Sequence, residues 1–175
     1  IAGGKTQTGD HYGVAPNTTL VHGKVLDSSG SGSFADILTA MEWTLTHESD
    51  VDVLSLSLGT DGYESAFIQP VENLRSAGVV VVAAVGNHGP QSSSSPGNVY
   101  GSLSVGASTP DGAIAEFSSG ENIVTNRSWN RTVPDSWPDS YTVPDVAAPG
   151  VDINSAAPGG EYRQATGTSM ATPHV

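Results

Sequence analysis

The 175-residue chain has no cysteine. Disulfides, thiolate nucleophiles and thiolate metal sites are therefore excluded from this sequence. Positive charge is scarce as well, because 6 Lys and Arg stand against 18 Asp and Glu and leave a net charge of −12. Such a surface repels nucleic acid and anionic membranes, so we expect neither as a partner. The negative charge is typical of a protein adapted to high salt, but it also fits an ordinary acidic surface.

Long hydrophobic runs are also missing. No apolar stretch approaches the ~20 residues of a membrane helix. The first residues, IAGG, have neither the basic start nor the apolar stretch of a secretory signal. Hydrophobic residues make up 37% of the chain, which excludes a fully disordered protein, and the length predicts one domain. Glycine is abundant at 21 residues, so tight turns and close backbone approaches should be frequent.

The remaining pattern alternates strands with helices. We expect strands at residues 18–26, 51–57, 79–85 and 103–106. A capping box formed by Ser33 and Asp36 should start a helix that ends near Glu48, and a second helix should stop at Gly78. Strands separated by helices predict an α/β fold of three layers, with a mostly parallel sheet flanked by helices. The valine-rich third strand should be buried on both faces, and the polar segment 120–141 should be a surface excursion.

Two loops that leave the carboxyl ends of predicted strands have an unusual composition. Residues 84–89 (AVGNHG) place the amide of Asn87 at the carboxyl end of a predicted strand, where open parallel sheets bind ligands. Residues 167–169 (GTS) place the hydroxyl of Ser169 at the start of a helix, where free N–H groups can stabilise an oxyanion. Taken alone, the first loop can be a simple turn and Ser169 a simple helix cap.

The last nine residues decide between these interpretations. Their sequence, GTSMATPHV, is similar to the nucleophile motif of subtilisin-like serine proteases. The resemblance extends over almost the whole chain, through residues 21–27 (VHGKVLD), 55–59 (SLSLG), 79–89 and 146–151 (VAAPGV). It implies that residues 1–175 are a partial subtilisin-like peptidase domain, incomplete at both ends, from a secreted, extracellular, monomeric enzyme that acts on peptides or proteins. The acidic balance and the lack of cysteine resemble the halolysin-type enzymes of salt-loving archaea.

The resemblance also implies roles for individual residues. Ser169 would attack the scissile carbonyl, and Asn87 would donate its side-chain amide to the oxyanion beside the Ser169 N–H. An extended substrate would pair, as an added strand, with the backbone of Ser57, Leu58 and Gly59. The opposite wall of the primary specificity pocket would be formed by Ala84, Val85 and Gly86. Family members often have Ala at the position of Val85, so this pocket is expected to be narrower. Pro96 would follow a cis peptide bond.

One part of the family's machinery is absent from the sequence. A serine nucleophile needs a nearby base and usually an orienting carboxylate, and the family takes both from motifs N-terminal to the matched region. None of the five histidines replaces the missing base convincingly, and all are interpreted as structural or surface residues: His11, His22, His47, His88 and His174. We therefore expect an internal fragment that is inactive on its own.

Cofactors are not required for this chemistry. Subtilisin-like enzymes often bind structural Ca²⁺ through six or more oxygen ligands. Asp10 lies in a segment that resembles a calcium loop, but Lys5 is a poor neighbour, and Asp135 and Asp139 are typical of solvated turns. Calcium in the intact protein is left open, and no ligands are assigned.

Two other functions fit parts of the sequence. Residues 29–33 (SGSGS) follow a predicted strand and precede a helix, as phosphate-binding loops do, but they lack the full dinucleotide spacing. A non-catalytic homologue could instead bind peptides through residues 57–59. A sequence that continues upstream into an intact His motif would favour the enzyme.

Overall fold

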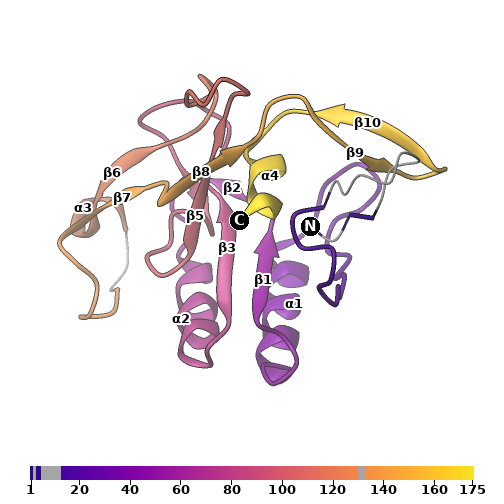
Figure 1. Cartoon of the computed structure of the whole chain (residues 1–175). Coiled ribbons are helices and arrows are strands. Elements are labelled where there is room, and N and C mark those ends of the chain that lie inside the picture. The colour runs from indigo at the N-terminus through magenta and orange to yellow at the C-terminus, as the bar shows by residue number, and fades with distance from the viewer. Residues whose placement is uncertain (2, 5–12, 130–132) are drawn as a thin grey trace.

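The computed structural model describes residues 1, 3–4, 13–129 and 133–175. A sheet of four strands forms its centre, and every pairing in this sheet is parallel (Figure 1). In spatial order the strands are β1 (Val53–Leu56), β3 (Val80–Ala84), β5 (Leu103–Ser108) and β8 (Val146–Pro149). The predicted parallel α/β architecture is confirmed.

The helices begin and end close to their predicted limits. They are α1 (Phe34–Thr46), α2 (Ile68–Ser76) after the 3-10 turn η1 (Ser65–Phe67), and α4 (Thr168–Ala171) continued by η2 (Thr172–His174). Ser33 caps α1, because its Oγ accepts a hydrogen bond from the Asp36 N–H. Pro70 lies in the first turn of α2, where no helical N–H is required, and Gly78 with φ +89° follows the end of that helix.

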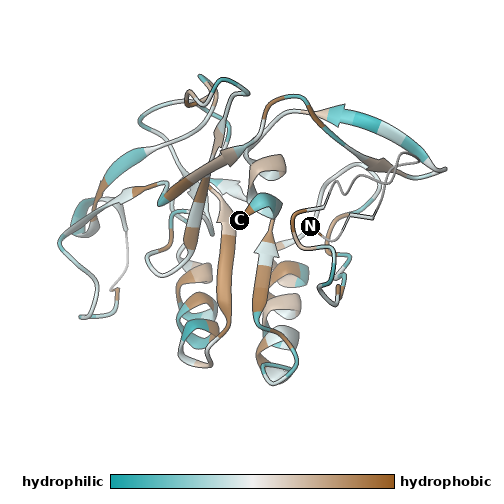
Figure 2. Cartoon of the chain, in the orientation of Figure 1, coloured by the Kyte–Doolittle hydropathy of each residue, from teal (hydrophilic) through white to brown (hydrophobic). Residues whose placement is uncertain are grey.

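Alternation along β3 shows how the layers are stacked. Val81 and Ala83 belong to the larger hydrophobic cluster together with residues of α1 and α2. Val82 belongs to a second cluster that includes Ala171 of α4. Because successive side chains of a strand point to opposite faces, α1 and α2 cover one face of the sheet and α4 covers the other. Figure 2 shows the strongly hydrophobic stretches of β1 and β3 between these layers.

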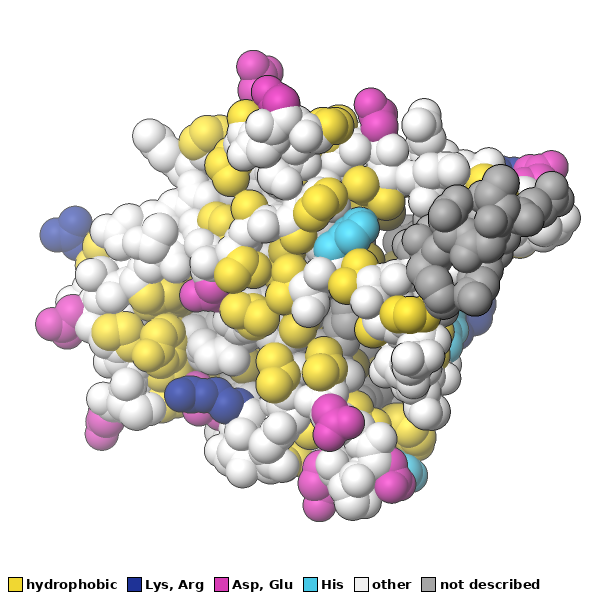
Figure 3. Space-filling view, viewed as in Figure 1, with side chains coloured by type: hydrophobic (Ala, Val, Ile, Leu, Met, Phe, Trp, Pro, Cys, Tyr) yellow, Lys and Arg dark blue, Asp and Glu magenta, His cyan; other side chains and the backbone are white. Residues whose placement is uncertain are grey.

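The layer formed by α4 is narrow. Val53 and Val80 are register partners on the same face of the sheet, and their side chains are 53% and 48% exposed. Hydrophobic side chains gather over the middle of the molecule in the view of Figure 3. The expectation that strand 79–85 is buried on both faces is therefore not met at Val80, because the described side chains leave it 48% exposed to solvent.

The strand predicted at residues 18–26 does not form. These residues have no regular secondary structure, and the side chains of Leu20 and Val21 are 58% and 59% exposed. A strand exists only through pairing with a neighbour, and β1 is an edge strand whose outer side pairs with no described strand. The local composition of residues 18–26 predicted a strand, but composition does not show whether a partner strand is present.

The predicted surface excursion at residues 120–141 is instead part of the core. It contains β6 (Glu121–Val124), the short helix α3 (Thr125–Ser128) and β7 (Ser140–Val143), and β6 pairs antiparallel with β7. Trp129 and Trp137 are only 4% and 7% exposed and belong to the larger cluster. The indole Nε1 of Trp137 donates a 2.9 Å hydrogen bond to Glu72 Oε1 on α2. Aromatic packing thus outweighs the polar composition of this segment.

Tyr141 connects this segment to the loop after β4 (Ser94–Ser95). Its hydroxyl donates to the Asn98 carbonyl at 2.8 Å and accepts from Trp129 Nε1 at 2.9 Å. Burial raises the pKa of the Tyr141 hydroxyl above its usual range, so the group keeps the proton that it donates.

The remaining strands form two small antiparallel pairs. β2 (Thr60–Asp61) pairs with β4, and β9 (Ile153–Ala157) pairs with β10 (Glu161–Ala165). The Ser95–Pro96 peptide bond is cis, as predicted, and the Val143–Pro144 bond is cis as well. Among the described residues, no helix is long and apolar enough to cross a membrane.

Candidate active site

The topology brings the two predicted substrate segments together. β1 runs into residues 57–59 and β3 runs into residues 85–87, and these strands are parallel neighbours. The carboxyl ends of parallel neighbours lie at the same edge of the sheet. The first turn of α4 lies at this edge too, because Ser169 contacts Ser57 and Thr168 contacts Asn87.

The orientation of the Asn87 side chain is set by Thr168. Asn87 Oδ1 accepts two hydrogen bonds, one from the Thr168 backbone N–H at 2.8 Å and one from Thr168 Oγ1 at 3.0 Å. Thr168 is fully buried, and its carbonyl accepts from Thr172 Oγ1 one turn later. With Oδ1 engaged, Nδ2 is the end of the Asn87 amide that is available to donate to another molecule.

Ser169 and Ser57 are linked by two reciprocal hydrogen bonds. Ser57 Oγ donates to the Ser169 carbonyl at 2.7 Å, and Ser169 Oγ donates to the Ser57 carbonyl at 3.1 Å. The second bond leaves the lone pairs of Ser169 Oγ free. The first helps to fix the start of α4 relative to the segment that follows β1.

A cavity of about 210 Å³ lies between these segments. It is lined by Leu58, Gly59, Asp61, Ala84, Gly86, Asn87, His88, Ser94, Thr168 and Ser169. Asn87 and Ser169 thus line one shared cavity. Both predicted walls contribute lining residues: Leu58 and Gly59 from one, and Ala84 and Gly86 from the other. Ser57 does not line the cavity itself, but it is hydrogen-bonded to Ser169, which does.

Val85 does not line this cavity. Its side chain is fully buried in the larger hydrophobic cluster, and only its backbone is directed toward the site, where its carbonyl accepts from the Ser94 N–H at 2.8 Å. A narrowing of the cavity by the Val85 side chain is therefore not seen. The residue type is instead constrained at Gly86, because an added Cβ atom would lie 2.5 Å from Ser94 Oγ and the backbone φ of +114° favours glycine.

Four lining residues were not singled out as site residues from the sequence: Asp61, His88, Ser94 and Thr168. The sequence held a signal for two of them, because His88 follows Asn87 directly and Thr168 precedes Ser169. The sequence predicts a surface or structural role for His88, and its side chain is 60% exposed. Its Nε2 lies 2.9 Å from Asp61 Oδ1, so it forms a contact at the cavity.

None of the described histidines contacts Ser169. His47 stacks on Trp43, with ring centroids 4.1 Å apart, and His174 Nδ1 lies 2.8 Å from the Met170 carbonyl. His22 is exposed, and His88 contacts Asp61. His11 lies outside the described residues. Within the described part of the chain, Ser169 therefore has no imidazole base within reach.

A metal site is not formed by the described residues either. No group of three or more His, Cys, Asp or Glu side chains is arranged there to hold an ion. Asp135 and Asp139 are described and form no such group, whereas Asp10 and Lys5 lie outside the described residues.

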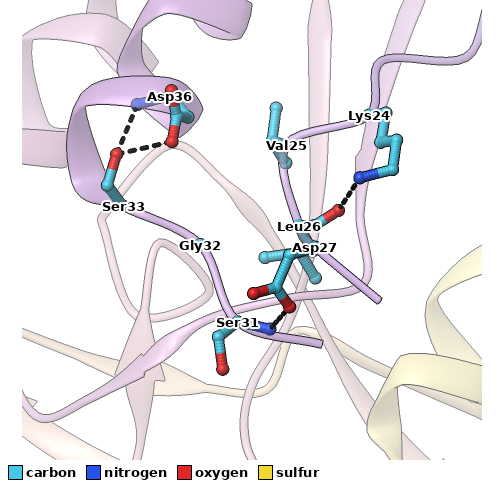
Figure 4. Close-up of a pocket in the computed structure, with 8 residues that line it drawn as sticks. All are labelled: Lys24, Val25, Leu26, Asp27, Ser31, Gly32, Ser33 and Asp36. Atoms are coloured by element: carbon cyan, nitrogen blue, oxygen red, sulfur yellow. Dashed lines mark hydrogen bonds between the residues drawn. The ribbon is translucent and has the colours of Figure 1, made fainter. Parts of the chain in front are cut away.

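A second cavity, of about 590 Å³, adjoins the glycine-rich turn before α1 (Figure 4). Asp27 Oδ1 accepts hydrogen bonds from the Ser29 N–H at 2.8 Å and from the Ser31 N–H at 3.1 Å. The Ser29 hydroxyl and these backbone groups hold the pKa of Asp27 below its usual value. The N–H groups of Ser29 and Ser31, which a phosphate-binding loop would offer to its ligand, thus donate to the carboxylate of Asp27. A second carboxylate, that of Asp36, also lines the cavity. The arrangement does not suit an anionic nucleotide.

Comparison with known proteins identifies relatives of this chain. A model of the subtilase family matches residues 1–175. The chain is 38% identical over 167 residues to subtilisin E of Bacillus subtilis (strain 168), covering 93% of this chain and 38% of that protein. It is 37% identical over 164 residues to subtilisin Savinase of Lederbergia lenta, covering 93% and 52%.

A solved structure gives the same result. The crystal structure of a cold-adapted subtilisin-like serine proteinase superposes with a TM-score of 0.74 at 31% identity, covering 95% of this chain and 54% of that one. The chain spans about two fifths to about half the length of these relatives. Sequence and fold agree over nearly all of its residues, and the chain belongs to the subtilase family.

Proposed function

We propose that the intact protein is a secreted, extracellular serine endopeptidase that hydrolyses peptide bonds through an acyl-enzyme on Ser169. The observation that carries this proposal is the shared cavity, which is lined by Ser169 from α4 and by Asn87 from the loop after β3. Family membership supports the same reaction. The halolysin type is a narrower proposal, supported by the net charge of −12.

The chemistry assigns one step to each group. Ser169 Oγ forms a bond to the scissile carbonyl carbon and gives its proton to a base, which passes it to the leaving amine as the C–N bond breaks. Asn87 Nδ2 and the Ser169 N–H in the first turn of α4 donate to the oxyanion. Water then hydrolyses the ester. No cofactor is needed for these steps.

We assign the base and its orienting carboxylate to residues outside this sequence. His47, His88 and His174 contact other groups, His22 is exposed, and Ser169 Oγ donates to a backbone carbonyl instead of a base. The 175 residues alone are then expected to be inactive. The backbone of Ser57, Leu58 and Gly59 would pair with the substrate as an added strand, facing Ala84 and Gly86 across the cavity. We propose a monomer without nucleic acid or membrane partners.

Active-site labelling tests the proposal. The intact protein should hydrolyse peptide substrates and should be labelled on Ser169 by a serine-directed phosphonate, as located by mass spectrometry of the digested protein. Ser169→Ala should abolish labelling and reduce hydrolysis to the ~10³–10⁴-fold acceleration over water that remains when a triad member is removed. Labelling of another serine would contradict the assignment. Binding of peptides without hydrolysis or labelling would instead indicate a non-catalytic homologue.

A further inference from the structure

The contact between His88 and Asp61 joins the two walls of the cavity. Asp61 belongs to β2, which continues from the wall at residues 57–59. His88 follows Asn87 on the opposite wall, and both side chains line the cavity. Their contact of 2.9 Å between Asp61 Oδ1 and His88 Nε2 therefore spans from one wall to the other.

The backbones that carry these side chains are both held in place. Asp61 is the register partner of Ser94 in the β2–β4 pair, and Ser94 Oγ donates to Asp61 Oδ1 at 3.2 Å. The His88 N–H donates to Ser119 Oγ at 3.0 Å. The backbone of Asp61 is thus fixed by strand pairing, and its carboxylate is oriented by Ser94 and His88.

Among the described residues, Asp61 is also the only carboxylate that lines the cavity, and no Lys or Arg among them lines it. The other lining groups are small, apolar or neutral, apart from His88, which carries a charge only when it is protonated. A substrate side chain that enters the cavity therefore meets negative charge at Asp61.

The contact with His88 stabilises the Asp61 carboxylate only weakly. The side chains of His88 and Asp61 are 60% and 72% exposed, and ion pairs exposed to this degree contribute little free energy. An ammonium or guanidinium group, which is always charged near neutral pH, can replace the imidazole as the partner of the carboxylate.

We propose that Asp61 is a specificity-determining residue, and that the cavity selects substrates with Lys or Arg immediately before the scissile bond. This inference rests on the proposed function, because it places the substrate side chain in the cavity beside Ser169. In the proposal His88 orients Asp61 in the unliganded enzyme and yields to the cationic side chain.

The test compares peptides that differ only at the residue before the scissile bond: Lys, Arg, norleucine or Glu. The intact enzyme should show kcat/KM values that are highest for Lys or Arg and lowest for Glu, with norleucine as the uncharged reference. Asp61→Asn should lower the ratio of the Lys to the norleucine value by about tenfold, the size expected for loss of one close charge pair at a protein surface. His88→Gln, which keeps a neutral donor, should retain the preference for Lys.

Asp50→Asn is the matched control, because it removes the same charge from an exposed residue before β1, at the opposite end of that strand from the cavity. It should leave the ratio unchanged. An Asp61→Asn enzyme with the wild-type ratio, or a wild-type enzyme that prefers norleucine, would overturn the role of Asp61 while leaving the peptidase assignment intact. A wild-type protein that cleaves none of the peptides would overturn both.

Discussion

The hydroxyl of Thr168 decides how the amide of Asn87 is presented. A free Asn side chain can rotate and can exchange the positions of its oxygen and nitrogen, but two donors from a buried residue bind Oδ1 here. One of them is a backbone N–H that every residue type other than proline supplies. The other, Oγ1, is specific to Thr or Ser. Thr168 is therefore a positioning residue that acts through Asn87.

Thr168→Val tests this role, because valine keeps the shape of the side chain and removes the donor. We expect kcat to fall by about tenfold, less than the 10²–10³-fold measured when the oxyanion donor of subtilisin itself is removed, a magnitude carried over from that enzyme. KM should change less than kcat, since the oxyanion forms only in the transition state. Steady-state kinetics of the intact enzyme provides the measurement. Thr168→Ser should restore most of kcat, whereas an equal loss in both variants would indicate a general packing defect.

The sequence allowed Ser169 and Asn87 to be predicted because each lies in a local motif whose chemistry can be recognised. Asp61 and Thr168 were missed as site residues for a different reason. Thr168 contacts a residue 81 positions earlier, and Asp61 meets His88 through the parallel pairing of β1 with β3 together with the antiparallel pairing of β2 with β4. Such contacts depend on the register of the sheet, which composition and spacing do not determine.

Among the elements, the pair β6 and β7 shows the largest difference between expectation and structure. The polar residues of this segment predicted a surface loop, but its Trp129 and Trp137 rings pack against each other with centroids 5.5 Å apart, and Trp129 also packs against Tyr63, which follows β2, at 5.2 Å. Each aromatic side chain buries about 150–250 Å², so a few of them can form a core within a segment that is otherwise polar. The segment is therefore fixed to α2 and to the loop that carries Asn98.

Trp137→Ala should destabilise the folded protein by about 3–5 kcal/mol, the usual cost of truncating a buried tryptophan. The substitution also leaves Glu72 without its indole donor. Trp43→Ala is the matched control, because Trp43 is 45% exposed on α1 and its removal should cost about 1 kcal/mol or less. Denaturant unfolding of the intact protein measures both values. Similar losses in the two variants would show that the segment is not part of the core.

For the whole molecule, the dominant feature is uncompensated negative charge. The described residues form two ion pairs, His88–Asp61 and Arg163–Glu161, and both are exposed. Exposed pairs contribute little, so salt has few attractive interactions to weaken. Repulsion among 18 acidic residues remains, and it destabilises the compact state. The excess of acidic residues can be counted from the sequence. Only the structure shows that the described residues form no network of ion pairs that would compensate for it.

Salt should therefore stabilise the protein. Raising the ionic strength from 0.01 M to 1 M shortens the Debye length from about 30 Å to about 3 Å and screens the repulsion. We expect Tm to rise with NaCl, by about 2–4 °C for each kcal/mol of repulsion that is removed from a protein of 150–250 residues. The variant Glu48→Gln/Asp50→Asn/Asp52→Asn neutralises three exposed acids around the turn between α1 and β1, so its Tm should depend less steeply on salt. Calorimetry of both proteins in parallel distinguishes screening from general salting-out, because a salting-out effect would raise the Tm of the wild type and the variant by the same amount.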